Sequence, residues 1–135
     1  MNTVRHSYAD RSVSVRQLML KFGITSALSE DITEFAVNRP GGYWVEDRDG
    51  WRYVPCPELT LSNLQGLSTA IAVFNHKQLD RDTPIQSLTL PDGERCQIVL
   101  PPVCENGTIS MTIRKPSSQR FTLADYANSG RLNRG

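Results

Sequence analysis

Two short runs of alternating apolar residues, separated by a proline-containing loop, constrain the fold of this chain more than any other feature. The apolar positions are Cys96, Ile98 and Leu100 in the first run, and Ile109, Met111 and Ile113 in the second. An apolar side chain at every second position is typical of a half-buried β-strand. Two prolines and an Asn-Gly pair lie between the runs. The sequence therefore predicts an antiparallel hairpin with a moderately long loop.

The alternation also suggests a register for this hairpin. If the apolar side chains of both strands share one core face, the register places Cys96 beside Met111. Arg95 is then expected opposite Thr112 and diagonal to Arg114, at a spacing of roughly 7 Å. The two arginines would lie on the polar face of the hairpin, away from the core.

Arg95 and Arg114 are the candidate binding residues of the chain. Two guanidinium groups at this spacing repel one another unless an anion lies between them or carboxylates flank them. The planar guanidinium group also matches pairs of phosphate oxygens. From spacing alone, the commoner interpretation is that both are exposed strand arginines without a ligand.

The rest of the chain predicts a mixed fold. Helical spacing of apolar residues indicates helices over residues 13–22, 24–30, 61–75 and 122–128. Either Thr60 or Ser62 is expected to cap the third of these. Strand patterns occur over residues 31–38, 43–46, 51–54 and 84–90, in addition to the hairpin. We therefore expect an α+β fold, in which a mostly antiparallel sheet of about six strands has helices packed on one face.

A chain of 135 residues is long enough for one domain with a modest core. Residues 1–12 are polar and aperiodic, and we expect a flexible arm there. Residues 13–130 are expected to form the domain. Residues 131–135 carry little that could be buried and are expected to form a linker or tail.

Composition and motifs exclude several classes of function. The formal net charge of +1 does not call for nucleic acid or an anionic membrane as partner. The three cysteines lack metal-ligand spacing, and no stretch resembles a signal peptide or a membrane span. The sequence also lacks a phosphate-binding loop, a zinc motif, a nucleophile elbow and a recognisable pair of catalytic carboxylates. We expect no catalytic residue and no metal ligand here, and no hydrolysis by this chain alone.

Four segments carry a resemblance to a known family. They read VNRPGGYWVE, GERCQIVLPP, GTISMTIRKPS and FTLADYANSG, in this order along the chain. The sequence resembles the amino-terminal domain of the hexameric traffic ATPases of bacterial type IV secretion systems, over about residues 28–130. The resemblance covers most of the chain.

The resemblance implies a division of labour between two domains. In that family the amino-terminal domain forms a ring, a hexamer, and packs over a carboxy-terminal RecA-type motor domain. ATP with Mg is held between the two domains of the full-length protein. The positions that match the family's phosphate-contacting arginines are Arg95 and Arg114, which would act as sensors and clamps. No cofactor is expected on this chain alone.

The resemblance also implies partners and a location. The expected partners are the chain's own carboxy-terminal ATPase domain, further copies of itself and other inner-membrane components of the secretion system. The expected location is cytoplasmic and peripheral, at the inner face of the bacterial inner membrane. The full-length protein would power substrate export or pilus assembly.

Two alternatives remain open on the sequence. The chain could be an assembly or substrate-docking module of a secretion system without nucleotide contacts. It could also be a small domain that binds anions or nucleic acid through Arg95, Arg114, Lys115 and Arg120. The near-zero net charge and the lack of an aromatic platform beside these residues argue against the second alternative and against a sequence-specific nucleic-acid partner.

Overall fold

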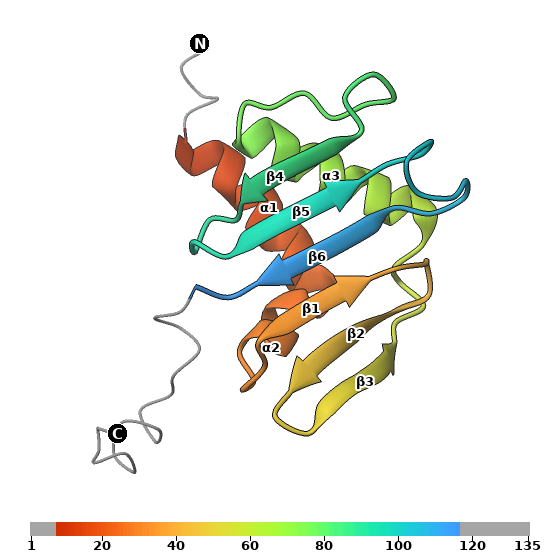
Figure 1. Cartoon of the computed structure of the whole chain (residues 1–135). Coiled ribbons are helices and arrows are strands. Elements are labelled where there is room, and N and C mark those ends of the chain that lie inside the picture. The colour runs from red at the N-terminus through yellow and green to blue at the C-terminus, as the bar shows by residue number, and fades with distance from the viewer. Residues whose placement is uncertain (1–7, 117–135) are drawn as a thin grey trace.

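The computed structural model describes residues 8–116, which form one layer of helices packed on one β-sheet (Figure 1). The helices are α1 (Tyr8–Lys21), α2 (Ile24–Leu28) and α3 (Leu61–Phe74). The strands are β1 (Glu34–Val37), β2 (Gly42–Asp47), β3 (Gly50–Pro55), β4 (Ile85–Thr89), β5 (Arg95–Val99) and β6 (Ser110–Arg114). The predicted α+β fold, with helices on one face of the sheet, is confirmed.

The sheet has six strands in the order β3-β2-β1-β6-β5-β4, and every neighbouring pair is antiparallel. It consists of two three-stranded meanders, one from each half of the chain. The meanders join at the centre of the sheet, where β1 pairs with β6. The first and the last strands of the described residues are therefore neighbours, and β3 and β4 form the two edges.

Helix α3 joins these two edges and runs behind the sheet (Figure 1). Of the two caps expected from the sequence, Thr60 is the one used, because its hydroxyl oxygen accepts a hydrogen bond from the Asn63 backbone N–H at 3.1 Å. Leu64, Leu67 and Ile71 then follow at helical spacing and are fully buried. This apolar stripe explains why the helix lies on the sheet rather than in solvent.

Helix α1 packs against α3 and begins earlier than expected, at Tyr8 rather than Val13. Tertiary packing stabilises the added turn, since Ser12 is 7% exposed and lies one turn before the buried Val15. Gly23, at φ 78°, follows the end of α1 as the sequence predicts. Residues 1–7 of the expected arm, the expected helix over 122–128 and the tail over 131–135 lie outside the described residues.

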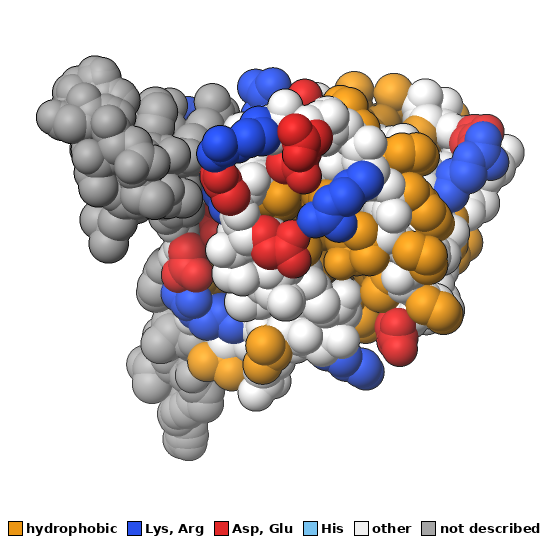
Figure 2. Space-filling view, turned by 90° about the horizontal axis from the view of Figure 1, so that it is seen from below, with side chains coloured by type: hydrophobic (Ala, Val, Ile, Leu, Met, Phe, Trp, Pro, Cys, Tyr) orange, Lys and Arg blue, Asp and Glu red, His pale blue; other side chains and the backbone are white. Residues whose placement is uncertain are grey.

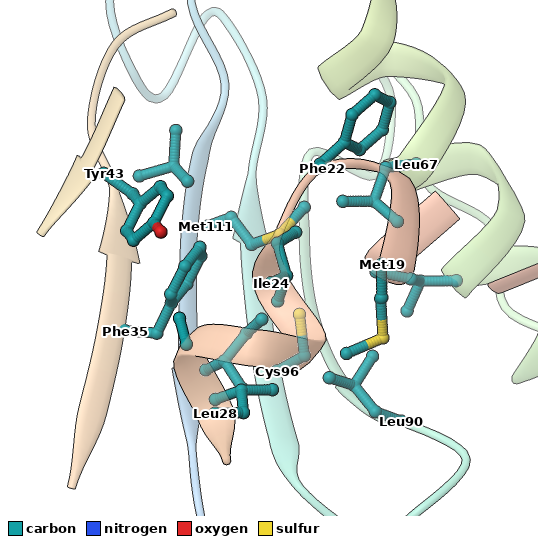
Figure 3. Close-up of a cluster of buried hydrophobic side chains, with 14 of the residues drawn as sticks. Met19, Phe22, Ile24, Leu28, Phe35, Tyr43, Leu67, Leu90, Cys96 and Met111 are labelled. Atoms are coloured by element: carbon teal, nitrogen blue, oxygen red, sulfur yellow. The ribbon is translucent and has the colours of Figure 1, made fainter. Parts of the chain in front are cut away.

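The core lies between the helices and one face of the sheet (Figure 3). The helices contribute Met19, Ile24, Leu28 and Leu67, the turn after α1 contributes Phe22, and the strands contribute Phe35, Tyr43, Cys96 and Met111. The rings of Phe35 and Tyr43 stack with their centroids 4.6 Å apart. No helix within residues 8–116 has the length and apolar character needed to cross a membrane.

The opposite face of the sheet is covered by no helix of residues 8–116, and we call it the open face (Figure 1). Pairing aligns one row of side chains across four strands of this face: Arg95, Arg114, Glu34 and Glu46. Three aromatic side chains of β2 and β3 lie on the same face and are 37–48% exposed: Trp44, Trp51 and Tyr53. The open face therefore combines charged and aromatic groups.

Charged side chains accompany β3 at its edge of the sheet. Arg48, in the turn before β3, pairs with Asp31 at 3.0 Å, and Arg52 of β3 pairs with Glu30 at 2.8 Å. Figure 2 views the molecule from this side and shows most of the charged side chains on one half of the surface and most of the hydrophobic ones on the other. Charges beside an edge strand hinder pairing with a second sheet.

Candidate functional site

The two candidate arginines are direct cross-strand neighbours on the open face. Arg95 of β5 pairs with Arg114 of β6, and Cys96 pairs with Ile113. The sequence-based register, which placed Arg95 opposite Thr112 and diagonal to Arg114, is therefore wrong by two residues. Directly opposed residues have Cβ atoms about 5 Å apart, so the two guanidinium groups start closer together than expected.

The loop between the strands accounts for this difference. β5 ends at Val99 and β6 begins at Ser110, so Leu100 and Ile109 both belong to the connection. Ile109 is nevertheless buried, and the Thr108 hydroxyl donates to the backbone oxygen of Asn38 at 2.7 Å. A shift of two residues keeps every side chain on its own face, so alternation alone cannot distinguish the two registers.

The arginines line a hollow of about 430 Å³ on the open face. Its other lining residues come from β1, β4, β5 and β6: Glu34, Ser87, Leu88, Thr89, Cys96, Gln97 and Thr112. This volume lies within the range of small-ligand sites, about 300–1,000 Å³. Two guanidinium groups and three hydroxyl groups thus face one hollow.

The two arginines differ in their partners. Arg114 Nε donates to Glu34 Oε1 at 3.0 Å, and the Arg114 side chain is 61% exposed. Arg95 has no ion pair and no side-chain hydrogen bond within the part of the chain that the structure describes. Like charges directly opposite one another across strands are destabilising. Glu34 offsets this repulsion on one side only, so the arginines still outnumber the carboxylate at the hollow.

This arrangement can bind an anion, and the thiol that borders the hollow is not reactive. The Cys96 thiol is 1% exposed, and burial, with Glu94 as a smaller contribution, raises its pKa to about 12. A thiol in this state is an inert core group. Among residues 8–116, no cluster of three or more His, Cys, Asp or Glu side chains could hold a metal ion.

Sequence reasoning identified both arginines but missed the acid between the two halves of the sheet. Glu34 lies in a strand that was predicted, yet its pairing with Arg114 links positions 80 residues apart. A single sequence carries no local signal for such a pairing. Ser87 and Thr89 were not singled out, although they lie in the predicted strand over residues 84–90. Thr112 was expected opposite Arg95, and the structure pairs it with Gln97 instead.

The wider basic group considered for nucleic acid does not form one surface. Lys115 is only 8% exposed, and its ammonium group donates to the backbone oxygen of Glu30. Arg120 lies outside the described residues. An aromatic pair does share the open face with the arginines, contrary to expectation: Trp44 and Tyr53 contact edge to face, with ring centroids 5.2 Å apart. Glu34 and Glu46 share this face with the aromatic pair and Arg114, and their carboxylates disfavour a polyanion across the whole face.

Comparisons with known proteins find similar sequences. The chain is 39% identical over 130 residues to the type IV secretion system protein VirB11 of Bartonella henselae, covering 96% of this chain and 36% of that protein. It is 50% identical over 99 residues to VirB11 of Brucella suis, covering 73% of this chain and 27% of that protein. It is 47% identical over 96 residues to the type IV secretion system protein PtlH of Bordetella pertussis, covering 71% of this chain and 28% of that protein. No protein-family model matches the chain.

A solved structure is also similar. It is the VirB11 ATPase from the Brucella suis type IV secretion system in complex with sulphate, with a TM-score of 0.79 and 44% sequence identity. The match covers 91% of this chain and 36% of that chain. This chain thus spans about a third of the length of the proteins it matches, and it corresponds to their N-terminal part.

Proposed function

Since the chain is the counterpart of the N-terminal part of the VirB11-type ATPases of type IV secretion systems, we propose that it is the nucleotide-sensing domain of such an ATPase. In this proposal, the hollow at Arg95 and Arg114 receives the phosphates of ATP, which is bound mainly by a RecA-like motor domain. The single observation that carries the proposal is the direct opposition of the two arginines across β5 and β6.

Electrostatics supports this reading of the hollow. Two opposed guanidinium groups, with one carboxylate on the far side of Arg114, leave a surplus of positive charge, which an anion would neutralise. The hydroxyl groups of Ser87, Thr89 and Thr112 could donate to further phosphate oxygens. The similar VirB11 ATPase of Brucella suis was solved in complex with sulphate, an anion of related shape.

The residues of this chain would bind and orient rather than react. Arg95, which has no partner among the described residues, would contact the terminal phosphate, and Arg114 would exchange Glu34 for a phosphate oxygen. Such contacts stabilise negative charge that develops during phosphoryl transfer. They also couple the nucleotide state to closure of the two domains. The magnesium that accompanies ATP in the full-length protein would be bound by the motor domain.

The remaining parts of the proposal follow from the family. The domain would form a ring, a hexamer, with further copies of itself and would pack over its own motor domain. The assembly would lie in the cytoplasm, at the inner face of the inner membrane, and contact other components of the secretion system there. It would power substrate export or pilus assembly.

A chimeric ATPase tests the nucleotide role. Residues 1–130 of this chain would replace the matching N-terminal part of the Brucella suis VirB11 ATPase. Changing Arg95→Ala and Arg114→Ala together should lower ATP turnover at least about a hundredfold, since the loss of even one donor to developing charge costs about 10²–10³ in kcat. The control is Arg39→Ala with Arg48→Ala, because these arginines are 74% exposed and pair with acids away from the hollow.

The two outcomes are distinct. If the Arg95 and Arg114 variant loses turnover while the control keeps it, the nucleotide role stands. Unchanged turnover and unchanged ATP affinity in the Arg95 and Arg114 variant would reject it.

The exposed aromatic residues favour a second candidate, an assembly or docking module without nucleotide contacts. Trp44, Trp51 and Tyr53 lie together on the open face, and large aromatic side chains are enriched at protein interfaces. In this case Trp44→Ala with Tyr53→Ala should dissociate the chimera in sedimentation experiments. The Arg95 and Arg114 variant should then keep both its assembly and its turnover.

A further inference from the structure

A second hollow lies on the helix-covered side of the sheet, away from the arginines. It has a volume of about 550 Å³ and is bordered by α1, α2 and the turn before β5. Its lining residues are Arg16, Met19, Leu20, Thr25, Leu28, Ser29, Pro91, Asp92 and Glu94. Glu94 and Arg95 are adjacent in the chain, but alternation sends them to opposite faces.

Glu94 is the unusual residue of this hollow. It is only 7% exposed, and its Oε1 atom is buried without a hydrogen-bond partner within the described residues. Burial is the main cause that raises the pKa of the Glu94 carboxyl group above its ordinary value, and Asp92 adds to the effect. A buried acceptor without a donor is costly, and native structures contain few of them.

The cations near Glu94 have other partners. Arg16 forms an ion pair with Asp92 at 2.8 Å, and the Lys115 ammonium group donates to the backbone oxygen of Glu30. Both attract the Glu94 carboxylate from a distance, and neither forms a hydrogen bond with its Oε1 atom. The hollow therefore offers one buried acceptor that the described part of the chain does not satisfy.

The walls of the hollow suit a long apolar stem. Met19 of α1 and Leu28 of α2 project into the space between these helices and the sheet (Figure 3). Leu20 also lines the hollow and is 69% exposed. The exposed Val13 lies two turns earlier on the same helix. A partner that covered this surface would bury apolar area around a polar centre.

We propose that this hollow binds an arginine side chain presented by another protein chain. The guanidinium group donates to Glu94 Oε1, and its remaining N–H groups reach the hydroxyl oxygens of Thr25 and Ser29. The methylene stem lies along Met19, Leu28 and Pro91, in the way that long basic side chains cover apolar surface. Arginine anchors in desolvated pockets are also common hot spots of protein interfaces.

Other classes of ligand fit less well. An anion would meet the carboxylates of Glu94 and Asp92, and an uncharged apolar group would leave Glu94 Oε1 unsatisfied. A divalent cation would need several oxygen ligands, and residues 8–116 contain no group of three or more candidate ligands. A guanidinium group supplies several donors at once and is the group best matched to a carboxylate.

The test uses the full chain, isotope-labelled, and a pair of matched peptides. Acetyl-Leu-Arg-Leu-amide is titrated while amide chemical shifts are followed, and the control peptide replaces arginine by citrulline, which has nearly the same shape without the charge. We expect the arginine peptide to bind with a Kd on the order of 1 mM and to shift residues of α1, α2 and the turn at residues 91–94. The citrulline peptide should bind about tenfold more weakly, the loss expected for one charge-assisted hydrogen bond.

Two variants make the result specific to the hollow. Glu94→Gln should weaken the arginine peptide about tenfold, whereas Glu105→Gln, which removes an exposed carboxylate of the loop after β5, should not. Thr25→Trp changes an exposed residue and should block the hollow without altering Glu94. The proposal is overturned if both peptides bind equally, if neither binds, or if Glu94→Gln and Thr25→Trp leave arginine-peptide binding unchanged.

Discussion

Arg114 forms an ion pair with Glu34, and a phosphate group bound at the hollow would compete with this pair. The Nε–Oε1 distance is 3.0 Å, and Glu34 is 19% exposed while Arg114 is 61% exposed. A pair this accessible contributes little to stability, about 0.2–1 kcal/mol. An anion at the hollow competes with Glu34 for the same guanidinium group.

Removing Glu34 should therefore favour the anion. We expect Glu34→Gln to raise the affinity of the chain for tripolyphosphate about two- to fivefold, which corresponds to the free energy of such a pair. Isothermal titration calorimetry measures the change. Glu105→Gln, which breaks the similar pair with Arg39 at 2.9 Å, serves as the control and should leave the affinity unaltered. A weaker affinity in Glu34→Gln would contradict the competition.

Glu94 should make the stability of the chain depend on pH. Burial raises its pKa in the folded state above the ordinary value of 4.5, so the folded chain holds this proton more tightly than the unfolded chain does. The stability from Glu94 is thus fully present below about pH 4.5 and is lost as the pH rises through the higher folded pKa. Relative to wild type, Glu94→Gln should gain stability between pH 4 and pH 7 in urea unfolding. If the difference in unfolding free energy between Glu94→Gln and wild type stays constant over this pH range, the prediction is contradicted.

The three cysteines should differ in reactivity. Cys56 and Cys96 are 8% and 1% exposed, and burial raises the pKa of both thiols. Cys104 lies half-buried in the loop after β5. Only thiolates react with alkylating agents. Iodoacetamide at pH 8 should therefore label Cys104 in the native chain, and label the other two only after unfolding, as read by mass spectrometry. Early labelling of Cys96 would place it outside the core.

At the same scale, the sequence identified which residues share a face but not which residues are neighbours. The alternation around Arg95 and Arg114 is local, and it assigned both arginines to the polar face correctly. The register depends on where the loop begins and ends, and a two-residue slip leaves the alternation intact. Glu34 lies beside Arg114 only because of the long-range pairing of β1 with β6.

Among the elements, the β2–β3 hairpin depends on a glycine that the alternation did not single out. A Cβ atom at Gly42 would lie 2.1 Å from the Tyr53 hydroxyl oxygen and 2.8 Å from the Val54 backbone oxygen. The Tyr53 ring therefore lies directly over Gly42 on the open face, beside Trp44. Any larger residue at position 42 must displace both this ring and the neighbouring strand.

Two glycine substitutions should consequently have opposite effects. Gly42→Ala should destabilise the chain by about 1–3 kcal/mol through overpacking. Gly66→Ala should stabilise it by about 0.5–1 kcal/mol, since position 66 lies in α3 with nothing within 4 Å and alanine is the better helix former. Thermal unfolding measures both. If the two variants are equally stable, the contact of the new Cβ atom at position 42 with Tyr53 and Val54 does not destabilise the chain.

The elements themselves were largely predictable because their signals are local. All six strands and α3 lie within a few residues of their predicted positions, and Thr60 resolves the choice of cap. The start of α1 was not predictable, since residues 8–12 are polar and show no apolar period. Ser12 is buried by packing that the sequence does not reveal.

At the scale of the whole molecule, two meanders form one sheet with a single covered face. The covered face holds the core and the Glu94 hollow, whereas the open face holds the arginines and the exposed aromatic residues. The strand order β3-β2-β1-β6-β5-β4 brings the two halves of the chain together at Glu34 and Arg114. Only this long-range pairing, which the sequence could not show, completes the candidate site.

The most direct measurement is a titration of tripolyphosphate into the isotope-labelled chain, with amide chemical shifts mapped onto the structure. The account predicts the largest shifts in β5 and β6, around Arg95 and Arg114, and their loss when both arginines are changed to glutamine. Shifts that fall elsewhere on the molecule, or that persist in the double variant, would contradict it.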